Sequence, residues 1–430
     1  MLRHTFFMGL STVLRLLTGT VVFIILARAW GPERFGVFMY AFTLTSLASL
    51  VADYGFSAQL MREVARAPAQ LGHAFASVMS AKLMILALVL VAAVLASVWR
   101  GASAGETAIL WVLLVGGLIG SFAESYIAVF RGLNRYHEET VIMVWVNLLH
   151  VGTICLLLWL GSGVLGVAWG ILGSRVLFLA MSWRTFRRMQ PQLPGFQVGS
   201  AAEGWHYIKV GFPFAAESGF TNFQSQADTL IVNYFLGPVA VGVYQAGLRL
   251  MQGANSFAQV LSNVYMTAMA GKLDDAGAMK LFGNRLFYQM LLIGTLCFLV
   301  FTIGAEPITR LLYGAKYSAL VELMPWFGLV LLARYVAASH GVILSAIGMQ
   351  SFRVAAIGGA LAVLFAATAV LVPSMKLKGM LLSSLTAVIV LELLYVLSLS
   401  LRDMPRGLSR RNVMLLVSIV AASVFLMQYK

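Results

Sequence analysis

The chain reads WGPERFGVFMY over residues 30–40 and LGPVAVGVYQA over residues 236–246. Both stretches follow the pattern apolar-Gly-Pro, two further residues, then apolar-Gly-Val-aromatic, and the second begins 206 positions after the first. Each stretch joins two long apolar segments. A pattern repeated at this distance indicates two similar halves, and internal duplication of this kind is typical of membrane transporters.

The composition is that of a membrane protein. The chain is 60% hydrophobic and 11% charged, whereas about a quarter of the residues in soluble domains are charged. Apolar runs long enough to cross a hydrocarbon core of about 30 Å recur along the chain, and the alternation expected of a membrane β-barrel is absent. Because lipid admits only helices and closed barrels, the sequence predicts an all-α membrane protein. The net charge of +14 fits basic cytoplasmic loops, and no aromatic-basic module points to a nucleic-acid partner.

The apolar runs predict two helical lobes. Thirteen stretches are predicted to cross the membrane, at 6–28, 37–60, 76–99, 107–130, 140–161, 164–184, 207–236, 239–268, 285–305, 320–346, 353–373, 377–401 and 412–429. We therefore predict a six-helix lobe over 1–184, a cytoplasmic linker over 185–206, a second six-helix lobe over 207–401, and a basic loop with a candidate thirteenth membrane helix over 402–430. Six is an even number, so the two bundles have the same orientation and form a parallel repeat.

The basic residues predict the orientation of the chain in the membrane. With the N-terminus inside, the predicted cytoplasmic segments hold seventeen Lys and Arg and the external segments hold eight. Because cytoplasmic loops carry the excess of positive charge, we predict a cytoplasmic N-terminus.

The chain has none of the short motifs of phosphate-loop or hydrolytic sites: no G-x-x-x-x-G-K-[ST], no H-E-x-x-H and no G-x-S-x-G. The cysteines Cys155 and Cys297 and the intramembrane histidines His150 and His340 have no partner at metal-binding spacing. We therefore predict no catalytic residue, no metal and no cofactor, and a protein that is not an enzyme.

Polar stripes run along four predicted helices, although an Arg or Asp at the centre of a membrane helix costs about 2.5–3.5 kcal/mol. The stripes are Ser11, Arg15 and Thr18; Thr43, Ser46 and Asp53; Glu217, Thr221, Gln224 and Asp228; and Gln245, Arg249, Gln252, Ser256, Gln259 and Asn263. The first two stripes match the last two after the shift of 206 residues. We predict that these helices surround a polar central cavity; the alternative is that the stripes join helices by hydrogen bonds.

Two arginines are the main candidates for binding an anionic headgroup. Arg15 and Arg249 each carry a guanidinium group, which matches phosphate oxygens bidentately. The alternative for Arg249 is an internal ion pair with Asp228 or Glu217. The predicted substrate-binding residues are Arg15, Thr18, Gln224, Arg249, Gln252, Ser256 and Arg334.

Four acidic residues are candidates for ion coupling or for a gate, because a buried carboxylate can titrate near neutral pH. They are Asp53, Glu124, Glu217 and Asp228. The alternatives stay open: Glu217 and Asp228 can be counter-charges for arginines, Asp53 can cap its helix, and Glu124 can belong to a structural ion pair. Lys82 is interpreted as extending its amine to the membrane interface.

Several stretches resemble the polysaccharide transporter family, whose best-known members are the Wzx-type O-antigen flippases. They are ARAWGPERFG at 27–36, ADYG at 52–55, REVA at 62–65, DTLI at 228–231, LGP at 236–238, GVY at 242–244 and Arg249. The resemblance covers about residues 1–400. The superfamily includes multidrug antiporters and the peptidoglycan lipid flippase, so the resemblance implies two six-helix lobes in a V-shaped, MATE-like arrangement that work by alternating access. It also implies a cation-lined lumen, which agrees with Arg15 and Arg249.

The function implied by the resemblance is that of a flippase. It would move an undecaprenyl-pyrophosphate-linked oligosaccharide, an O-antigen or other surface polysaccharide unit, from the inner to the outer leaflet of the bacterial inner membrane. Implied partners are this lipid, membrane lipids, a polysaccharide polymerase and chain-length machinery. The nearest alternative is an ion-coupled multidrug antiporter, which would prefer acidic and aromatic cavity residues. A membrane-embedded glycosyltransferase or polymerase would need a sizeable external loop, and a structural scaffold would not need matching polar stripes.

Overall fold

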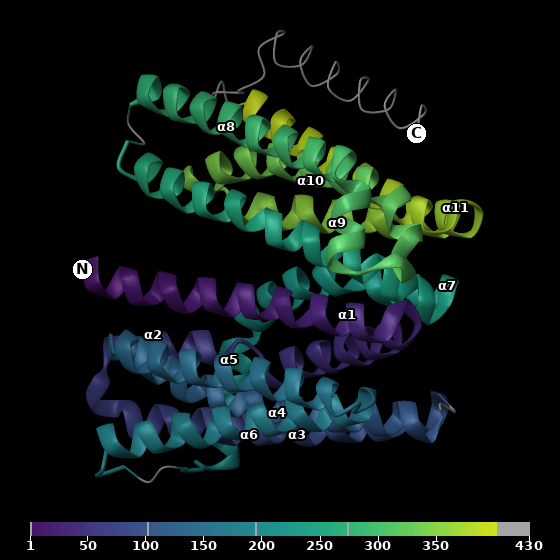
Figure 1. Ribbon diagram of the computed structural model, residues 1–430. Coiled ribbons are helices and arrows are strands. Elements are labelled where there is room, and N and C mark those ends of the chain that lie inside the picture. The colour runs from purple at the N-terminus through teal and green to yellow at the C-terminus, as the bar shows by residue number, and fades with distance from the viewer. Residues whose placement is uncertain (1, 101–102, 194–195, 273–274, 402–430) are drawn as a thin grey trace. The chain divides into compact units, whose positions relative to one another are not determined.

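The computed structural model describes residues 2–100, 103–193, 196–272 and 275–401, with side chains except at 2–18, 98–100, 213–214, 216–222, 224–225, 270 and 276. Every regular element in this part of the chain is a helix (Figure 1). The α-helices are α1 (Leu2–Asp53), α2 (Phe56–Arg66), α3 (Leu71–Arg100), α4 (Ala104–Gly132), α5 (Tyr136–Trp159), α6 (Val164–Met189), α7 (Ala201–Ala270), α8 (Ala276–Ile303), α9 (Ala305–Leu312), α10 (Ser318–Ala346) and α11 (Gln350–Ser400). The short 3-10 helices η1 (Pro68–Gln70) and η2 (Ala315–Tyr317) precede α3 and α10.

The apolar helices agree with the predicted membrane fold. Within the described ranges, nine helices are long and apolar enough to cross a membrane. Three of them, α1, α7 and α11, each contain two predicted spans separated by a backbone break. The prediction of an all-α membrane protein is therefore confirmed. The candidate span at 412–429 lies outside the described residues.

Two of the backbone breaks fall in the repeated Gly-Pro motif. Gly31 has φ 77° and ψ 176°, and Gly237 has φ 79° and ψ −177°. Glycine adopts a positive φ without the steric penalty of a Cβ atom, and the proline that follows has the fixed φ suited to the first turn of a helix. The two copies of the motif therefore turn the backbone in the same way.

The predicted span 37–60 is wrong at its C-terminal end. Helix α1 ends at Asp53, because Tyr54 and Gly55 have φ values of 49° and 76° in the left-handed region. The next helix, α2, is separate and amphipathic, and it buries Phe56 and Leu60 on one face. Neither α2 nor α9 is a separate element in the sequence prediction, since both are shorter than a membrane span.

Contacts between residues divide the chain into two compact units. Unit 1 consists of the described residues up to Val22 together with Arg34–Leu230. Unit 2 consists of Phe23–Glu33 together with the described residues from Ile231 onward. Helix α1 therefore contributes to both units. The lobes predicted along the chain, 1–184 and 207–401 with the linker 185–206, stay a prediction.

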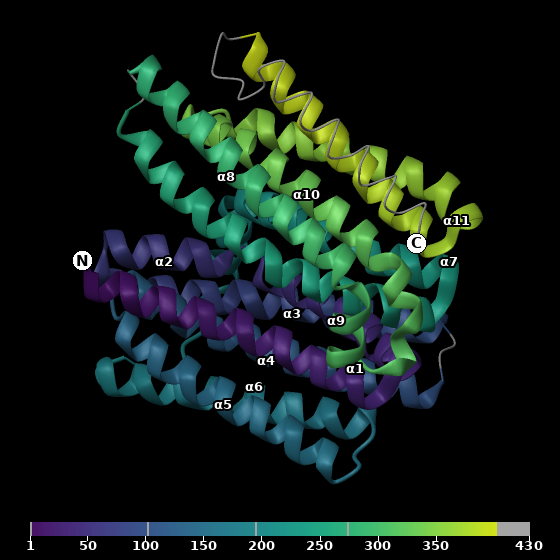
Figure 2. The ribbon, with the colours of Figure 1, turned by 45° about the horizontal axis from the view of Figure 1, so that its top comes forward.

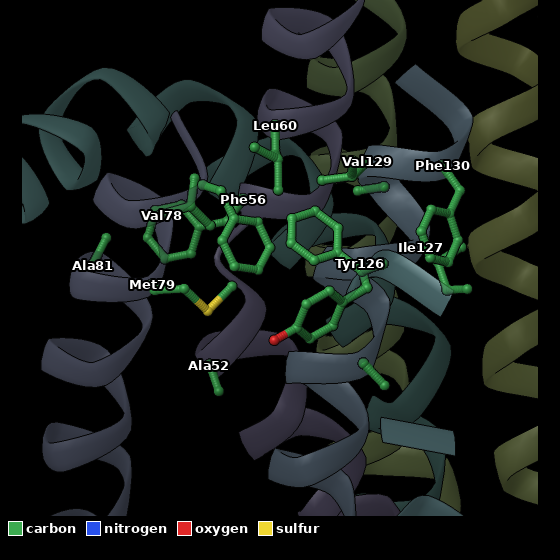
Figure 3. Close-up of a cluster of buried hydrophobic side chains, with 14 of the residues drawn as sticks. Ala52, Phe56, Leu60, Val78, Met79, Ala81, Tyr126, Ile127, Val129 and Phe130 are labelled. Atoms are coloured by element: carbon green, nitrogen blue, oxygen red, sulfur yellow. The ribbon is translucent and has the colours of Figure 1, made fainter. Parts of the chain in front are cut away.

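The core of unit 1 joins α2, α3, α4 and α6. The rings of Phe75, Tyr126 and Phe186, on α3, α4 and α6, pack with centroids 5.1 to 5.3 Å apart. Figure 3 shows Phe56 and Leu60 of α2 gathered with Tyr126 in the same apolar cluster. Because aromatic rings bury large apolar areas in defined geometries, this cluster fixes the three long helices against one another.

The segment before α7 is attached to α3, which places the first part of α7 within unit 1. The backbone N–H of Gly199 donates to the carbonyl of Ala76 at 3.0 Å, and Ser80 Oγ donates to the carbonyl of Gly199 at 2.8 Å. Further along, the Tyr207 hydroxyl donates to Glu63 of α2. These bonds hold the segment that leads to the unit 1 cavity.

In unit 2, α10 is packed between α8 and α11 (Figure 2). Two tyrosine hydroxyls tie the second part of α7 to this group. Tyr313 donates to the carbonyl of Ala246 at 2.9 Å, and Tyr335 donates to the carbonyl of Ala254 at 2.7 Å. Burial raises the pKa of Tyr313 well above its usual range, so this hydroxyl stays protonated and keeps its donor.

Candidate substrate-binding sites

Unit 1 contains a cavity of about 420 Å³ bounded by α1, α2, α4, α6 and α7. It is present because α1 and α4 carry small residues there, among them Ser49, Gly117 and Gly120. The two helices are so close that a Cβ atom on Gly117 would lie 2.2 Å from Ser49 Oγ. The polar residues of the wall are Thr45, Ser46, Ser49, Asp53, Ser57, Ser121, Glu124, Arg175 and Gln226.

Lys82 holds the Asp53 carboxylate at the cavity wall. Lys82 Nζ donates to Asp53 Oδ1 at 2.8 Å, to Ser121 O at 2.6 Å and to Ser121 Oγ at 3.0 Å. An ammonium group has three donors, so these bonds satisfy Lys82 although its side chain is 1% exposed. Ser57 Oγ donates to Asp53 Oδ1 at 2.7 Å, and none of these bonds uses Asp53 Oδ2. The interpretation of Lys82 as an interfacial residue is wrong, because its amine is buried and donates hydrogen bonds to Asp53 and Ser121.

Glu124 and Arg175 bring a second pair of opposite charges to the same cavity. The Arg175 side chain lies along α4, and a Cβ atom on Gly120 would be 3.3 Å from Arg175 Cδ. Glu124, one turn beyond Gly120, interacts electrostatically with the guanidinium group. The cavity wall therefore carries the cation Arg175 and the carboxylates Asp53 and Glu124, and the buried Lys82 pairs with Asp53.

In unit 2, Arg249 is held by an aromatic ring and an amide. Its guanidinium carbon lies 4.0 Å from the centre of the Phe23 ring, and Nη1 donates to Gln252 Oε1 at 3.0 Å. A cation over a ring is stabilised by about 0.5–2 kcal/mol. Within the described part of unit 2, Arg249 makes no ion pair, and its buried Nε has no hydrogen-bond acceptor. Within the described part of unit 2, the guanidinium group is therefore held in position without a carboxylate partner.

Arg334 is a second cation of unit 2 that has no carboxylate partner among the described residues of the unit. It is half-buried on α10 and makes no hydrogen bond or ion pair with any described residue of the unit. Phe327, two turns earlier and on the same face of α10, packs against α7, where a Cβ atom on Gly247 would lie 2.2 Å from the ring. Arg334 therefore lies on the face of α10 that runs along the helix carrying Arg249.

The structure groups the predicted site residues by unit. Arg249, Gln252 and Ser256 share one stripe of α7 in unit 2, and Ser256 Oγ donates to the carbonyl of Gln252 at 3.4 Å. Asp53 and Glu124 meet at the cavity of unit 1, whereas Asp228 is buried in unit 1 away from the cavity wall. Outside the residues with described side chains lie Arg15, Thr18, Glu217 and Gln224. The central cavity between the four striped helices stays a prediction.

Arg175 and Gln226 are among the wall residues that sequence reasoning missed. Gln226 lies off the predicted stripe of α7, two positions from Gln224 and from Asp228. Arg175 is on α6, a helix without a polar stripe. The charge of Arg175 within a membrane helix could have indicated that it lines a cavity, because such residues rarely face lipid. Spacing along the sequence does not identify its partner Glu124 on α4.

A contact between a buried histidine and a glutamate in unit 2 was also missed. His340 Nδ1 lies 2.8 Å from Glu392 Oε1 and joins α10 to α11. The imidazole is fully buried and packs on Phe287 of α8, with ring centroids 5.7 Å apart. The two residues are 52 positions apart in the sequence, so no local spacing connects them. Among the described residues, no three His, Cys, Asp or Glu side chains gather as metal ligands would.

Known proteins share this fold. Residues 1–269 match the model of a family described as polysaccharide biosynthesis protein, and no curated protein matches the chain. The lipid II flippase MurJ in an inward closed conformation aligns with a TM-score of 0.72 and 14% identity, over 100% of this chain and 98% of that chain. An inward-facing MATE multidrug resistance transporter aligns with a TM-score of 0.65 and 16% identity, over 91% of this chain and 94% of that chain. A eukaryotic MATE transporter aligns with a TM-score of 0.63 and 14% identity, over 94% and 97%.

At these identities the solved structures establish the fold. The chain has the helical membrane fold shared by the MATE transporters and the lipid II flippase. The matched structures are transporters and a flippase rather than enzymes. The chain is thus a multi-pass membrane protein of a transporter fold.

Proposed function

The chain belongs to the polysaccharide biosynthesis protein family, and on this basis we propose that it is a flippase for an undecaprenyl-pyrophosphate-linked oligosaccharide, an O-antigen or other surface polysaccharide unit. It moves this lipid from the inner to the outer leaflet of the bacterial inner membrane by alternating access, with its N-terminus in the cytoplasm. The family description and the fold shared with a lipid flippase support this proposal.

The observation that carries the proposal is the pair of arginines in unit 2. Arg249 and Arg334 lie on adjacent helices of apolar composition and make no ion pair with a described residue of the unit. An unpaired charge in a membrane helix is costly and marks a ligand or ion path. A pyrophosphate group supplies the missing negative charge, and guanidinium groups bind its oxygens through paired hydrogen bonds.

The proposed mechanism is physical. Arg249 and Arg334 replace part of the water around the pyrophosphate. The prenyl chain remains in lipid throughout, so no apolar surface has to leave the membrane. Phe23 and Gln252 keep the Arg249 guanidinium group in place before the ligand arrives, so less entropy is lost on binding. No covalent bond forms or breaks. The released lipid would then be used by a polysaccharide polymerase and its chain-length machinery.

Ion coupling is the second part of the proposal. Asp53, Glu124, Glu217 and Asp228 are the acidic residues that could take up a proton or cation during the cycle. Asp53 has a fixed counter-charge in Lys82, which makes it better suited to a closed gate than to free exchange of a cation. Asp228, buried in unit 1, is a stronger candidate for coupling than Asp53.

A multidrug antiporter is the second candidate, because MATE transporters share the fold. Many drugs exported by such a protein would be cationic. Arg249 and Arg334 would repel a cation, because like charges brought together in a binding site cost several kcal/mol. The charge of unit 2 therefore favours the anionic lipid.

Transport in proteoliposomes tests the proposal. The protein is reconstituted with fluorescent lipid-linked oligosaccharide, and the fraction that becomes accessible on the opposite side is measured over time. Arg249→Ala and Arg334→Ala should each lower the initial rate about ten-fold or more, since a hydrogen bond to a charged group is worth about 1.5–3 kcal/mol. Arg310→Ala is the matched control, because Arg310 is 73% exposed on α9 and pairs with Glu306 in its own helix.

Two outcomes would contradict the proposal. Wild-type rates for both Arg249→Ala and Arg334→Ala, at equal amounts in the membrane, would remove the arginines from the phosphate site. A wild-type protein that moves a cationic dye but no lipid-linked oligosaccharide would establish the antiporter instead.

A further inference from the structure

We propose that unit 1 binds an anionic phospholipid, with one acyl chain in an aromatic pocket beside the linker and the phosphate group on Arg187. The pocket has a volume of about 360 Å³ and lies between α4 and α6, which pack side by side (Figure 1). Its wall consists of Phe122, Tyr126, Val176, Leu179, Ala180, Trp183 and Phe196. All of these residues belong to unit 1, so the site lies within one unit and the inference does not depend on the proposed function.

The linker closes one side of the pocket with Phe196. In the sequence this residue lies between two points at which the linker is attached. Arg187 Nη1 donates to the carbonyl of Leu193 at 2.8 Å, and the backbone N–H of Gly199 donates to a carbonyl of α3 at 3.0 Å. A Cβ atom on Gly72 of α3 would lie 2.9 Å from the Leu193 side chain, so the linker also packs on α3. These contacts hold the linker beside the pocket.

The inner wall of the pocket is part of the aromatic core of unit 1. Tyr126 packs against Phe75 and Phe186 with ring centroids 5.1 and 5.3 Å apart, which keeps its ring from turning into the pocket. The wall contains no charged side chain. Burial of an ion or a sugar without hydrogen-bonding partners is unfavourable, whereas an acyl chain has no polar group to satisfy. The pocket therefore suits a hydrocarbon chain.

Helix α6 extends the pocket toward a cation. Its residues Val176, Ala180, Trp183 and Arg187 are separated by steps of four, three and four, so they share one face of the helix. From the first to the last of them the helix rises by about 16 Å, at 1.5 Å per residue. This length is close to half of a hydrocarbon core of about 30 Å. A lipid with its phosphate at Arg187 would therefore extend its acyl chain along the pocket to about the middle of the bilayer.

The charge beside the pocket selects the headgroup. Arg184, Arg187 and Arg188 lie at the C-terminal end of α6, and none of them makes an ion pair with a described residue of unit 1. A guanidinium group has five N–H donors, and the bond to Leu193 uses one of those on Arg187. Phosphate oxygens are strong acceptors for such donors. The three arginines would repel the ammonium group of a zwitterionic headgroup, so a headgroup with net negative charge fits better.

Native mass spectrometry of the full chain in detergent tests the inference. The probes are phosphatidylglycerol, which is anionic, and phosphatidylethanolamine, which is zwitterionic, with identical acyl chains. Wild type should bind phosphatidylglycerol about ten-fold more tightly, because a hydrogen bond to a charged group contributes that much or more. Arg187→Ala should remove this preference, and Arg187→Lys should retain most of it because the charge is kept. Arg135→Ala is the control for a lost charge, since Arg135 is 61% exposed just before α5.

A second variant tests the pocket itself. Ala180→Phe fills the pocket without a change in charge and should weaken the binding of phosphatidylglycerol about ten-fold. Ala87→Phe is the matched control, because Ala87 is exposed on α3 and does not line the pocket. It adds the same ring elsewhere, so the affinity should stay at the wild-type value. Thermal unfolding of all variants establishes that each one is folded.

Three results would overturn the inference. Equal affinity of wild type for the two phospholipids would show that the arginines do not select the headgroup. Wild-type affinity in a folded Ala180→Phe protein would show that the chain does not occupy the pocket. Displacement of phosphatidylglycerol by a lower concentration of undecaprenyl phosphate would make the pocket a prenyl-lipid site instead. None of these results bears on transport through Arg249 and Arg334, so the flippase proposal is tested separately.

Discussion

Lys82 is a single residue that organises the polar part of unit 1. Removal of an ammonium group from water costs several kcal/mol, and a close carboxylate with further hydrogen bonds offsets this cost. Here the carboxylate of Asp53 and two oxygens of Ser121 supply these interactions. Because Lys82 links α1, α3 and α4 at one point, the position of Asp53 depends on it.

Replacement of Lys82 should therefore destabilise the protein through its partner. Lys82→Met leaves the Asp53 carboxylate without its counter-charge and should lower the free energy of unfolding by about 3 kcal/mol. The double variant Lys82→Met, Asp53→Asn should recover a large part of that loss, since it removes both charges. Thermal unfolding in detergent measures both. Equal losses in the single and double variants would show that the two residues are not energetically coupled.

At the scale of elements, the glycines of the second motif copy act in two different ways. Gly237 has a positive φ and nothing within 4 Å of a Cβ position, so only its backbone conformation requires glycine. Gly242 has an ordinary helical φ, but a Cβ there would lie 1.9 Å from the carbonyl oxygen of Pro32. In unit 2, the turn between the two parts of α1 therefore packs directly against the backbone of α7.

Alanine substitutions should separate these two roles. Gly237→Ala should cost about 1–2 kcal/mol, the penalty of a left-handed backbone for an L-residue. Gly242→Ala should cost more, because the clash is with backbone and cannot be relieved by a rotamer change. Gly173→Ala on α6 is the control: it has open space, and it should stabilise its helix by up to about 1 kcal/mol. The melting temperatures rank the three variants, and a Gly242→Ala protein as stable as wild type would contradict this packing.

At the scale of the whole molecule, the sequence predicts the helices well and the side-chain pairs poorly. Long apolar runs must form helices in lipid, so the spans and the Gly-Pro breaks follow from local composition. The resemblance to polysaccharide transporters is confirmed by the family match over residues 1–269. The pairs Lys82–Asp53 and His340–Glu392 join residues 29 and 52 positions apart. Such pairs depend on which helices pack together, and the spacing within one helix does not specify this.

The predicted membrane orientation can be tested on the full chain. With Cys155 and Cys297 replaced by serine, single cysteines are placed at Gly163, an exposed position between α5 and α6, and at Gln192, an exposed position after α6. A membrane-impermeant maleimide applied to intact spheroplasts should label Gly163→Cys and not Gln192→Cys, because the prediction puts the N-terminus and the linker inside. Inverted vesicles should show the reverse labelling. The opposite pattern would reverse the orientation.

The residues Phe23–Glu33 belong to unit 2 although they come from the first tenth of the chain. A fragment that starts at the linker would lack the Phe23 ring that contacts Arg249. It would also lack the Pro32 carbonyl group that packs on Gly242. Chimeras that exchange halves between related proteins of this family would therefore transplant Arg249 without the ring that contacts it. For such a graft to work, the donor must supply residues 23–33 as well as its own C-terminal half.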